Sequence, residues 1–292
     1  MIFHPEKLQK TVIGLFFAGK KLQAARIEKG VAVQIINKEI NNRESEEFII
    51  NELLSVIEQL HDPSVSGIGI GVPSLVDVKN GIVYKPTHIP SWRKVHLKEI
   101  IEDRFSTPTF INNDANCFTM GEKYFGSAKA YDDVVGVTIG AGLGVGIIAN
   151  GVLYSGNNCG AGEFCSIPYR DHDYEYYCSA GYFEEKYGID YKTLALRSKR
   201  KDKIALAILE QFGFDLGNAI KTIVYALDPQ IIIIGGYLSE SYPYFEEAMH
   251  KKLNTFIYPE TIKKLVVRCS ETANIATFGA AALCFEKKEL TL

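Results

Sequence analysis

Three consecutive polar residues that end an apolar segment are the first candidates for chemistry. Asn112, Asn113 and Asp114 follow residues 109–111, which read as a buried strand, and a helical pattern continues over residues 117–125. Open α/β sheets bind ligands at the carboxyl ends of their strands. Asp114 would stand at or near a helix N-terminus, where unpaired amides and the helix dipole favour a charged carboxylate. Such a carboxylate is a candidate general base, although both residues could equally do no more than cap the helix.

Glycine-rich segments are the second kind of candidate. Gly140, Ala141 and Gly142 begin a run with glycine at alternate positions between two predicted strands. Such a run lets backbone amides face an anion such as a nucleotide phosphate, and a hairpin turn without a ligand is the alternative. An earlier turn is predicted at Gly19 and Lys20. Here too there are two alternatives, because Lys20 could contact phosphate or simply lie on the surface of a hairpin.

Other candidates stand farther along the chain. Gly235 and Gly236 follow an apolar strand, where an adenine ring could rest against the backbone, although a turn without a ligand fits equally well. Glu163 follows Gly-Ala-Gly, and Glu175 lies in a tyrosine-rich stretch. The two acceptor oxygens of a carboxylate suit the vicinal hydroxyls of a sugar. Isolated glutamates are usually surface residues, so these two matter only together with Asp114.

Composition and charge describe a globular protein. The chain has 292 residues, 47% hydrophobic and 23% charged, which is enough for a sizeable core and two domains. The net charge of -3 provides no global positive field that would attract nucleic acid or an anionic membrane. The six cysteines show no CxxC spacing, so we expect reduced thiols and a cytoplasmic protein. We expect no membrane helix, because five glycines interrupt the most apolar run, residues 134–149.

The hydrophobic periodicity predicts alternating strands and helices. Strands are expected at residues 12–17, 22–28, 31–36, 67–72, 82–84, 109–111, 134–139, 144–149, 152–153, 231–234 and 265–268. Helices are expected at residues 45–60, 97–104, 117–125, 180–187, 191–197, 204–227, 243–256 and 276–285, and residues 154–177 are expected to be irregular. Residues 67–72 carry glycine at alternate positions, so something must approach that backbone closely. Two strand meanders, each followed by strand-helix units, indicate a duplicated α/β domain with a cleft between the copies.

Taken together, these residues resemble the ROK family (repressor, open reading frame, kinase) of the sugar kinase, actin and Hsp70 superfamily. The most specific matching segments are residues 69–77, 113–116 with 121–122 and 125–126, 140–146, 161–164 and 228–236. The resemblance implies an α/β, two-lobed actin-like or ribonuclease H-like ATPase fold with an interlobe cleft. The N-terminal lobe would be residues 1–113, completed by a C-terminal helix at 273–292, and the C-terminal lobe would be residues 114–272.

The resemblance also implies an activity, the ATP-dependent phosphorylation of a hexose or N-acetylhexosamine at its 6-hydroxyl, with Mg²⁺, as in glucokinases and N-acetylglucosamine kinases. In that family Asp114 would take the proton from the 6-hydroxyl. The other hydroxyls and the pocket wall would be contacted by Asn113, Glu163, Glu175, Ser74, Ser166 and the loop of residues 86–92. The nucleotide would be contacted by Gly19, Lys20, Gly140, Ala141, Gly142, Gly235 and Gly236.

The phosphate motifs depart from the family pattern. The first motif of the family reads Asp-x-Gly-Gly-Thr, whereas this chain has Phe16 in place of the aspartate and Lys20 in place of the threonine. Ala141 replaces a threonine in the second motif. Lys20 could partly replace the lost Mg²⁺ ligand by pairing with phosphate. The alternative function is therefore a catalytically weak or inactive sugar-binding pseudokinase or regulator with a degenerate phosphate loop.

Other family properties lead to further expectations. Zinc-binding members carry a histidine and three cysteines after the Ala-Gly-Glu motif, but here Ser166 stands at the histidine position and residues 167–177 contain no cysteine, so we expect no structural zinc. About ten residues precede Val12, too few for a DNA-binding motif, so we expect no nucleic-acid partner and no membrane partner. A homodimer or higher homo-oligomer is expected from the relatives.

Overall fold

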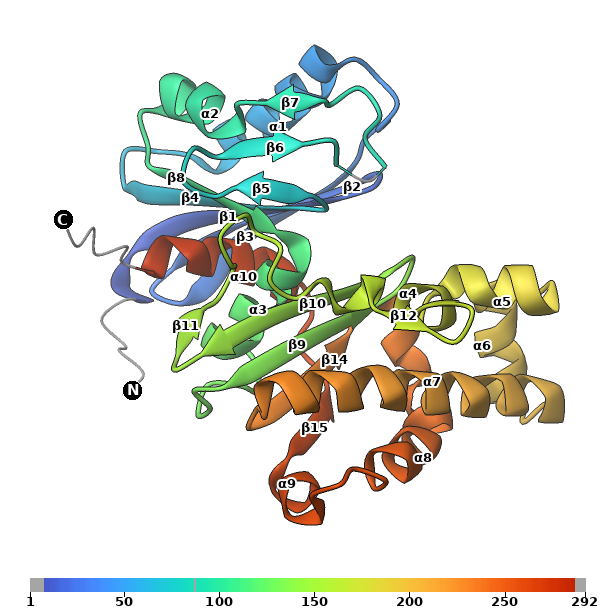
Figure 1. Cartoon of the computed structure of the whole chain (residues 1–292). Coiled ribbons are helices and arrows are strands. Elements are labelled where there is room, and N and C mark those ends of the chain that lie inside the picture. The colour runs from blue at the N-terminus through green and yellow to red at the C-terminus, as the bar shows by residue number, and fades with distance from the viewer. Residues whose placement is uncertain (1–7, 87, 287–292) are drawn as a thin grey trace. The chain divides into compact units, whose positions relative to one another are not determined.

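The chain forms two compact units, which are described separately. The computed structural model describes residues 8–86 and 88–286. Unit 1 consists of Met1–Asp132, Gly146–Ala161 and Glu271–Leu292, and unit 2 consists of Asp133–Val145 and Gly162–Ser270 (Figure 1).

Unit 1 is built on a five-stranded sheet with the order β3-β2-β1-β4-β8. Its strands are β1 (Thr11–Ala18), β2 (Lys21–Glu28), β3 (Val31–Glu39), β4 (Val65–Val72) and β8 (Thr109–Asn113). The first three pair antiparallel, and β4 and β8 extend the sheet in parallel pairing. The predicted meander and the predicted strand that precedes Asp114 are thereby confirmed.

One face of this sheet carries the large apolar core. Helix α1 (Glu46–Leu60) begins at Ser45, whose side chain accepts a hydrogen bond from the Phe48 amide. Its buried residues join those of helix α2 (Leu97–Phe105) and of a three-stranded sheet formed by β5 (Leu75–Asp77), β6 (Ile82–Tyr84) and β7 (Lys94–Val95). Trp92 is 1% exposed and belongs to this core.

The other face of the sheet is approached by a helix of small residues. Helix α10 (Ile275–Ala282) packs on β1, β2 and β4 and on helix α3 (Asp114–Tyr124), and residues 283–285 continue it as a 3-10 turn. A Cβ atom at Gly69 of β4 would lie 1.8 Å from the carbonyl oxygen of Ala280. Gly69 therefore admits the backbone of α10, which confirms that another segment approaches this strand closely.

A second five-stranded sheet has the order β11-β10-β9-β14-β15. Its strands are β9 (Val134–Ile139), β10 (Leu143–Ala149), β11 (Val152–Leu153), β14 (Ile231–Gly235) and β15 (Val266–Cys269), of which β9, β14, β15 and the start of β10 belong to unit 2. β14 pairs in parallel with both β9 and β15. Its four isoleucines are completely buried, as expected for a parallel strand with both faces covered.

The helices of unit 2 are α4 (Tyr174–Tyr177), α5 (Ala180–Tyr187), α6 (Tyr191–Lys199), α7 (Lys203–Leu227), α8 (Tyr242–Leu253) and α9 (Pro259–Lys264). Residues 154–177 are less irregular than expected. They include a 3-10 turn (Glu163–Ser166), a hairpin of β12 (Pro168–Tyr169) and β13 (His172–Asp173), and α4. Periodicity could not reveal these elements, because each is two to four residues long and too short to repeat a hydrophobic pattern.

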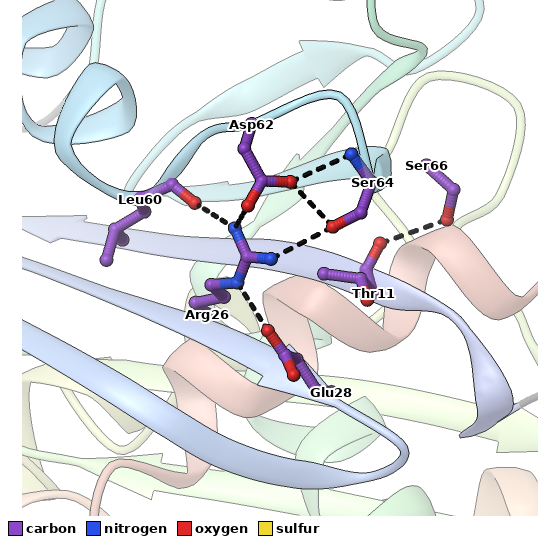
Figure 2. Close-up of polar contacts among 7 residues, drawn as sticks. All are labelled: Thr11, Arg26, Glu28, Leu60, Asp62, Ser64 and Ser66. Atoms are coloured by element: carbon purple, nitrogen blue, oxygen red, sulfur yellow. Dashed lines mark hydrogen bonds and ion pairs between the residues drawn. The ribbon is translucent and has the colours of Figure 1, made fainter.

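A polar network in unit 1 joins the segment after α1 to β2. Figure 2 shows Arg26 of β2 between Glu28 and Asp62, with N···O distances of 2.7 and 2.8 Å. Arg26 also donates to the Leu60 carbonyl and to Ser64 Oγ, both at 2.9 Å. The Ser64 hydroxyl and amide donate to Asp62, and these bonds together with Arg26 lower the pKa of Asp62 to about 2.

This network makes a prediction about acid stability. The folded pKa of Asp62 lies below its ordinary value of about 3.9, so its contribution to stability is complete above that value and is lost as the pH falls through about 2. We expect Asp62→Asn to lower the free energy of unfolding at pH 6, and the difference from the wild type to shrink between pH 4 and pH 2. Urea unfolding across this range measures it, with Asp103→Asn as a control carboxylate on α2; a difference independent of pH would contradict the assignment.

The close contact between α10 and α3 leads to a second prediction, about the stability of a variant at Gly279. A Cβ atom at Gly279 would lie 1.6 Å from the carbonyl oxygen of Cys117, which belongs to backbone and cannot rotate away. We expect Gly279→Ala to cost about 3 kcal/mol or more, which exceeds the roughly 1 kcal/mol that alanine contributes to a helix. In the control Gly181→Ala on α5 the nearest atom lies at 3.9 Å, so we expect unchanged or slightly higher stability. Equal unfolding midpoints for the two variants would contradict this packing.

Candidate functional site

The carboxyl ends of three strands of unit 1 lie side by side. Phe16 of β1 pairs with Gly71 of β4, and Gly71 pairs with Asn112 of β8. Asn113 and Asp114 follow directly, because β8 ends at Asn113 and α3 begins at Asp114. The expected position of these polar residues, at the carboxyl edge of the sheet, is confirmed.

Asn113 and Asp114 both contact the first turn of α3. The Asn113 side-chain oxygen accepts from the Ala115 amide at 2.8 Å and from the Asn116 amide at 3.4 Å, so Asn113 is the N-cap. The Ala115 amide also lies 2.9 Å from Asp114 Oδ1. Asp114 is half-buried in the first helical turn, where the amide dipoles stabilise a carboxylate.

Ser74 is connected to this edge through the backbone. Its carbonyl accepts from the Asn113 side-chain amide at 3.3 Å. Its hydroxyl lies 3.0 Å from the Leu75 carbonyl and 2.5 Å from that of Tyr84. The hydroxyl therefore bonds to the small sheet, and the structure brings Ser74, Asn113 and Asp114 together within unit 1.

A buried polar cluster beneath Asp114 was not recognised from the sequence. The Asn112 side-chain oxygen accepts from the Asn113 amide at 2.8 Å, from Asn116 Nδ2 at 2.9 Å and from Cys159 Sγ at 3.2 Å. Asn112 Nδ2 donates to Ser155 Oγ at 3.3 Å. The cluster ties the segment around residues 155–159 to the start of α3. A polar residue inside a buried strand, such as Asn112, is the one sequence signal for it.

The first phosphate motif lies at the same edge of unit 1. Phe16 is half-buried beside Gly71, where an added Cβ would lie 3.2 Å from the Phe16 ring. Gly19 adopts a left-handed conformation with φ of 62°, and a Cβ there would meet no atom within 4 Å. Lys20 is exposed on this turn. The turn is therefore open, but its strand offers an aromatic ring where a metal-binding carboxylate would be needed.

The second glycine turn lies in unit 2 and is held at both ends. Within it the Gly140 amide donates to the Gly142 carbonyl at 2.9 Å. The Ala180 amide donates to the Gly140 carbonyl at 2.8 Å, and the Leu143 amide donates to Glu175 Oε2 at 3.0 Å. A Cβ at Gly142 would lie 2.6 Å from this oxygen. The Glu175 carboxylate therefore lies directly against the backbone of the turn at Gly142.

The third glycine segment lies next to this turn. Gly235 pairs with Thr138 of β9, and Gly236 has a φ of 86°. A Cβ at Gly236 would lie 2.3 Å from the Ile139 carbonyl, and one at Gly140 would lie 2.9 Å from the Tyr237 ring. Two of the three predicted nucleotide-binding segments are thus brought together within unit 2.

Glu163 is the first and Ser166 the last residue of the 3-10 turn of unit 2, and Cys165 lies between them. Cys165 Sγ is 3.4 Å from Glu163 Oε2 and 3.6 Å from Ser166 Oγ. Burial, and then the nearby carboxylates of Glu163 and Glu175, raise the pKa of Cys165 to about 11. This thiol is protonated at neutral pH and is not an activated nucleophile.

A buried carboxylate on α7 was also missed. Asp215 is fully buried, accepts from Arg170 Nη2 at 2.7 Å and Tyr169 Oη at 3.0 Å through one oxygen, and from Gln211 Nε2 at 3.0 Å through the other. Asn218 Nδ2 in turn donates to Tyr169 Oη at 2.8 Å. These bonds attach the β12-β13 hairpin to α7. The signal in the sequence was an aspartate on the apolar face of the helix pattern.

Two further observations concern metals and membranes. Within residues 8–86 and 88–286, no three His, Cys, Asp or Glu side chains are grouped so that they could hold a metal ion. In the same part of the chain, no helix combines the length and apolarity needed to cross a bilayer.

These units and their glycine turns define an α/β protein with the two-lobed, actin-like fold of the ROK sugar kinases. The ROK family model matches residues 13–287, and the chain belongs to the ROK family. Both expectations, the fold class and the family, are confirmed.

The relatives include repressors and kinases. A xylose repressor of Bacillus spizizenii is 33% identical over 213 residues, 66% of this chain and 54% of the repressor, so the match spans about half of that protein. A glucokinase of Thermotoga maritima is 26% identical over 312 residues, 94% of this chain and 98% of the glucokinase. Among solved structures, a ROK family glucokinase from Streptomyces griseus in complex with glucose and AMPPNP is 24% identical, with a TM-score of 0.79, covering 94% of this chain and 98% of that one.

The capping role of Asn113 makes a third prediction. We expect Asn113→Ala to lower the free energy of unfolding by about 1 kcal/mol, because the Asn116 amide loses its acceptor and the Ala115 amide keeps only Asp114 Oδ1. Asn113→Ser is the matched control, since serine also loses the contact with Ser74 but retains a capping oxygen. Urea unfolding measures both variants. If they are equally stable, the side chain does not act as a cap.

Proposed function

We propose that this protein transfers the γ-phosphoryl group of ATP to the 6-hydroxyl of a hexose or N-acetylhexosamine. The observation that supports this most strongly is Asp114, a carboxylate at the N-terminus of α3 and at the carboxyl edge of the unit 1 sheet. Full-length similarity to a glucokinase supports the same activity.

In the proposed reaction Asp114 accepts the proton of the 6-hydroxyl. The hydroxyl oxygen then forms a bond to the γ-phosphorus, and the bond between that phosphorus and the oxygen bridging to the β-phosphate breaks. The products are the sugar 6-phosphate and ADP, and the proton remains on the carboxylate. Because phosphoryl transfer depends mainly on alignment and charge stabilisation, the residues that orient the two substrates supply most of the remaining catalysis.

Each unit would contribute its own contacts. In unit 1, Asn113 and the segment around Ser74 would bind sugar hydroxyls beside Asp114, and Gly19 and Lys20 would contact phosphate. In unit 2, Glu163 and Ser166 would bind sugar hydroxyls, and both side chains are exposed.

The nucleotide would be bound by the two adjacent glycine segments of unit 2. Gly140 and Gly142 lie against the side chains of Tyr237 and Glu175, and Gly236 adopts a backbone conformation that favours glycine. Such backbone can approach a phosphate or an adenine ring closely. Mg²⁺ would enter together with ATP as MgATP, the substrate.

A second candidate is a sugar-binding regulator without kinase activity. The specific observation that favours it is Phe16, which stands half-buried at the end of β1 where the family's kinases carry an aspartate. The match to a xylose repressor points in the same direction. Such a protein would keep the sugar contacts and lose phosphoryl transfer.

The proposed base makes a fourth prediction. We expect Asp114→Asn to reduce kcat by about 10²- to 10⁴-fold, because the amide cannot accept the proton, while the Kd of the sugar changes by less than about threefold. ADP formation measured over a panel of hexoses and N-acetylhexosamines gives kcat, and calorimetry gives the Kd.

Asp103→Asn on α2 serves as the control carboxylate and should leave both quantities unchanged. Full activity of Asp114→Asn would exclude the proposed base. Sugar binding by the wild type with no turnover of any sugar would favour the regulator.

A further inference from the structure

The glycine turn of unit 2 is held by one short stretch of chain. Ala180 donates to the Gly140 carbonyl at the start of the turn, and Glu175 accepts from the Leu143 amide at its end. The turn itself contributes one bond, from the Gly140 amide to the Gly142 carbonyl. Residues 175–180 therefore bond to the backbone of the turn at both ends.

Helix α4, which carries Glu175, depends on contacts with neighbouring elements for its position. α4 has four residues, and a single helical turn is not stable in isolation. Asp173 caps it by accepting from the Tyr176 amide at 2.8 Å, and Tyr174 Oη lies 2.8 Å from Thr222 Oγ1 on α7. Contacts with neighbouring elements thus determine where the Glu175 carboxylate lies.

The fully buried carboxylate of Asp215 provides a further contact for this region. The hairpin before α4 presents Arg170 and Tyr169 to Asp215, and the Arg170 guanidinium lies over the rings of Tyr169 and Tyr177 at 4.9 and 5.0 Å. Tyr177 belongs to α4 itself. A buried charge paired in this way is costly to separate, so the hairpin and α4 are held to α7.

From these contacts we infer that Glu175 is a positioning residue for the Gly140–Leu143 turn and acts on the nucleotide side of the reaction. The inference rests on the proposed function for the identity of the ligand, MgATP or MgADP. It assigns to Glu175 a bond to the Leu143 amide in place of the sugar hydroxyl that the family resemblance implies. The Asp215 contacts hold Glu175 in the position from which it makes this bond.

Charge and hydrogen bonding can be separated by two variants. Glu175→Gln removes the charge but keeps an oxygen that accepts from the Leu143 amide, whereas Glu175→Ala removes both. Because Glu175 is exposed, we expect Glu175→Ala to bind MgADP about 3- to 10-fold more weakly than Glu175→Gln. Both variants should bind the sugar with the wild-type Kd. Glu210→Ala, an exposed carboxylate on the outer face of α7, is the control and should bind both ligands like the wild type.

Calorimetry with MgADP, glucose and N-acetylglucosamine measures these constants. Equal MgADP affinity of the two Glu175 variants would overturn the inference. So would weaker sugar binding with unchanged MgADP binding, which is the result expected of a sugar ligand. Tighter MgADP binding by Glu175→Ala than by Glu175→Gln would mean that the side chain competes with phosphate, and would also overturn it.

Amide hydrogen exchange of the free protein separates this inference from the proposed function. Residues 140–146 should exchange faster in Glu175→Ala than in Glu175→Gln, because the Leu143 amide loses its acceptor. If exchange is unchanged, Glu175 does not position the turn. If exchange responds but the wild type binds no MgADP, the proposed kinase function fails and the positioning of the turn stands.

Discussion

The close approach of α10 to the sheet and to α3 is the constraint on which the unit 1 site depends. Glycines at positions 14, 69, 121 and 279 leave backbone in direct contact with backbone, where a Cβ would lie 1.6 to 2.2 Å from a carbonyl oxygen. Such contacts leave no freedom to repack through side-chain rotation. The axis of α3, and with it the place of Asp114 at the helix N-terminus, is therefore set by residues that carry no side chain.

Besides the glycines, two buried polar residues fix the arrangement of the segments around them. Asn112 and Asp215 are each almost or fully buried, and each accepts several hydrogen bonds, including one from Cys159 to Asn112 and two from Tyr169 and Arg170 to Asp215 that come from segments distant in sequence. A buried polar group is tolerated when its bonds are made and is costly otherwise, so each selects one arrangement of the loops around it. Asn112 orders the segment that includes Cys159 in unit 1, and Asp215 orders the β12-β13 hairpin in unit 2. Neither residue is among the predicted sugar- or nucleotide-contacting residues, but each holds in place a segment that carries or adjoins such residues.

The two candidate functions, a sugar kinase and a sugar-binding regulator, differ in what they require of the phosphate-binding residues. The sugar-contacting candidates Asn113, Asp114 and Glu163 are all present, whereas Phe16 stands in the first phosphate motif. An aromatic ring cannot bind a hydrated cation as a carboxylate does, so the first motif lacks the carboxylate and keeps only the positive charge of Lys20. The second motif keeps its glycines, and its turn has a defined partner in Glu175. In the proposed kinase reaction, the phosphate charge would therefore be stabilised mainly by unit 2 and by the Mg²⁺ that accompanies ATP.

The sequence by itself determined the strands and helices that are long enough to repeat their hydrophobic pattern, the family, and the place of Asn113 and Asp114 at a strand end. It also indicated that β4 would be approached closely, because alternate glycines have no other structural reason in a buried strand. Only the tertiary structure decided that α10 makes this approach, that Glu175 bonds to the glycine turn, and that Asp215 secures the hairpin. The reason is physical: local patterns reflect contacts within a few residues, whereas these partners lie 32 to 45 or more residues apart in the chain and meet only once the core has formed.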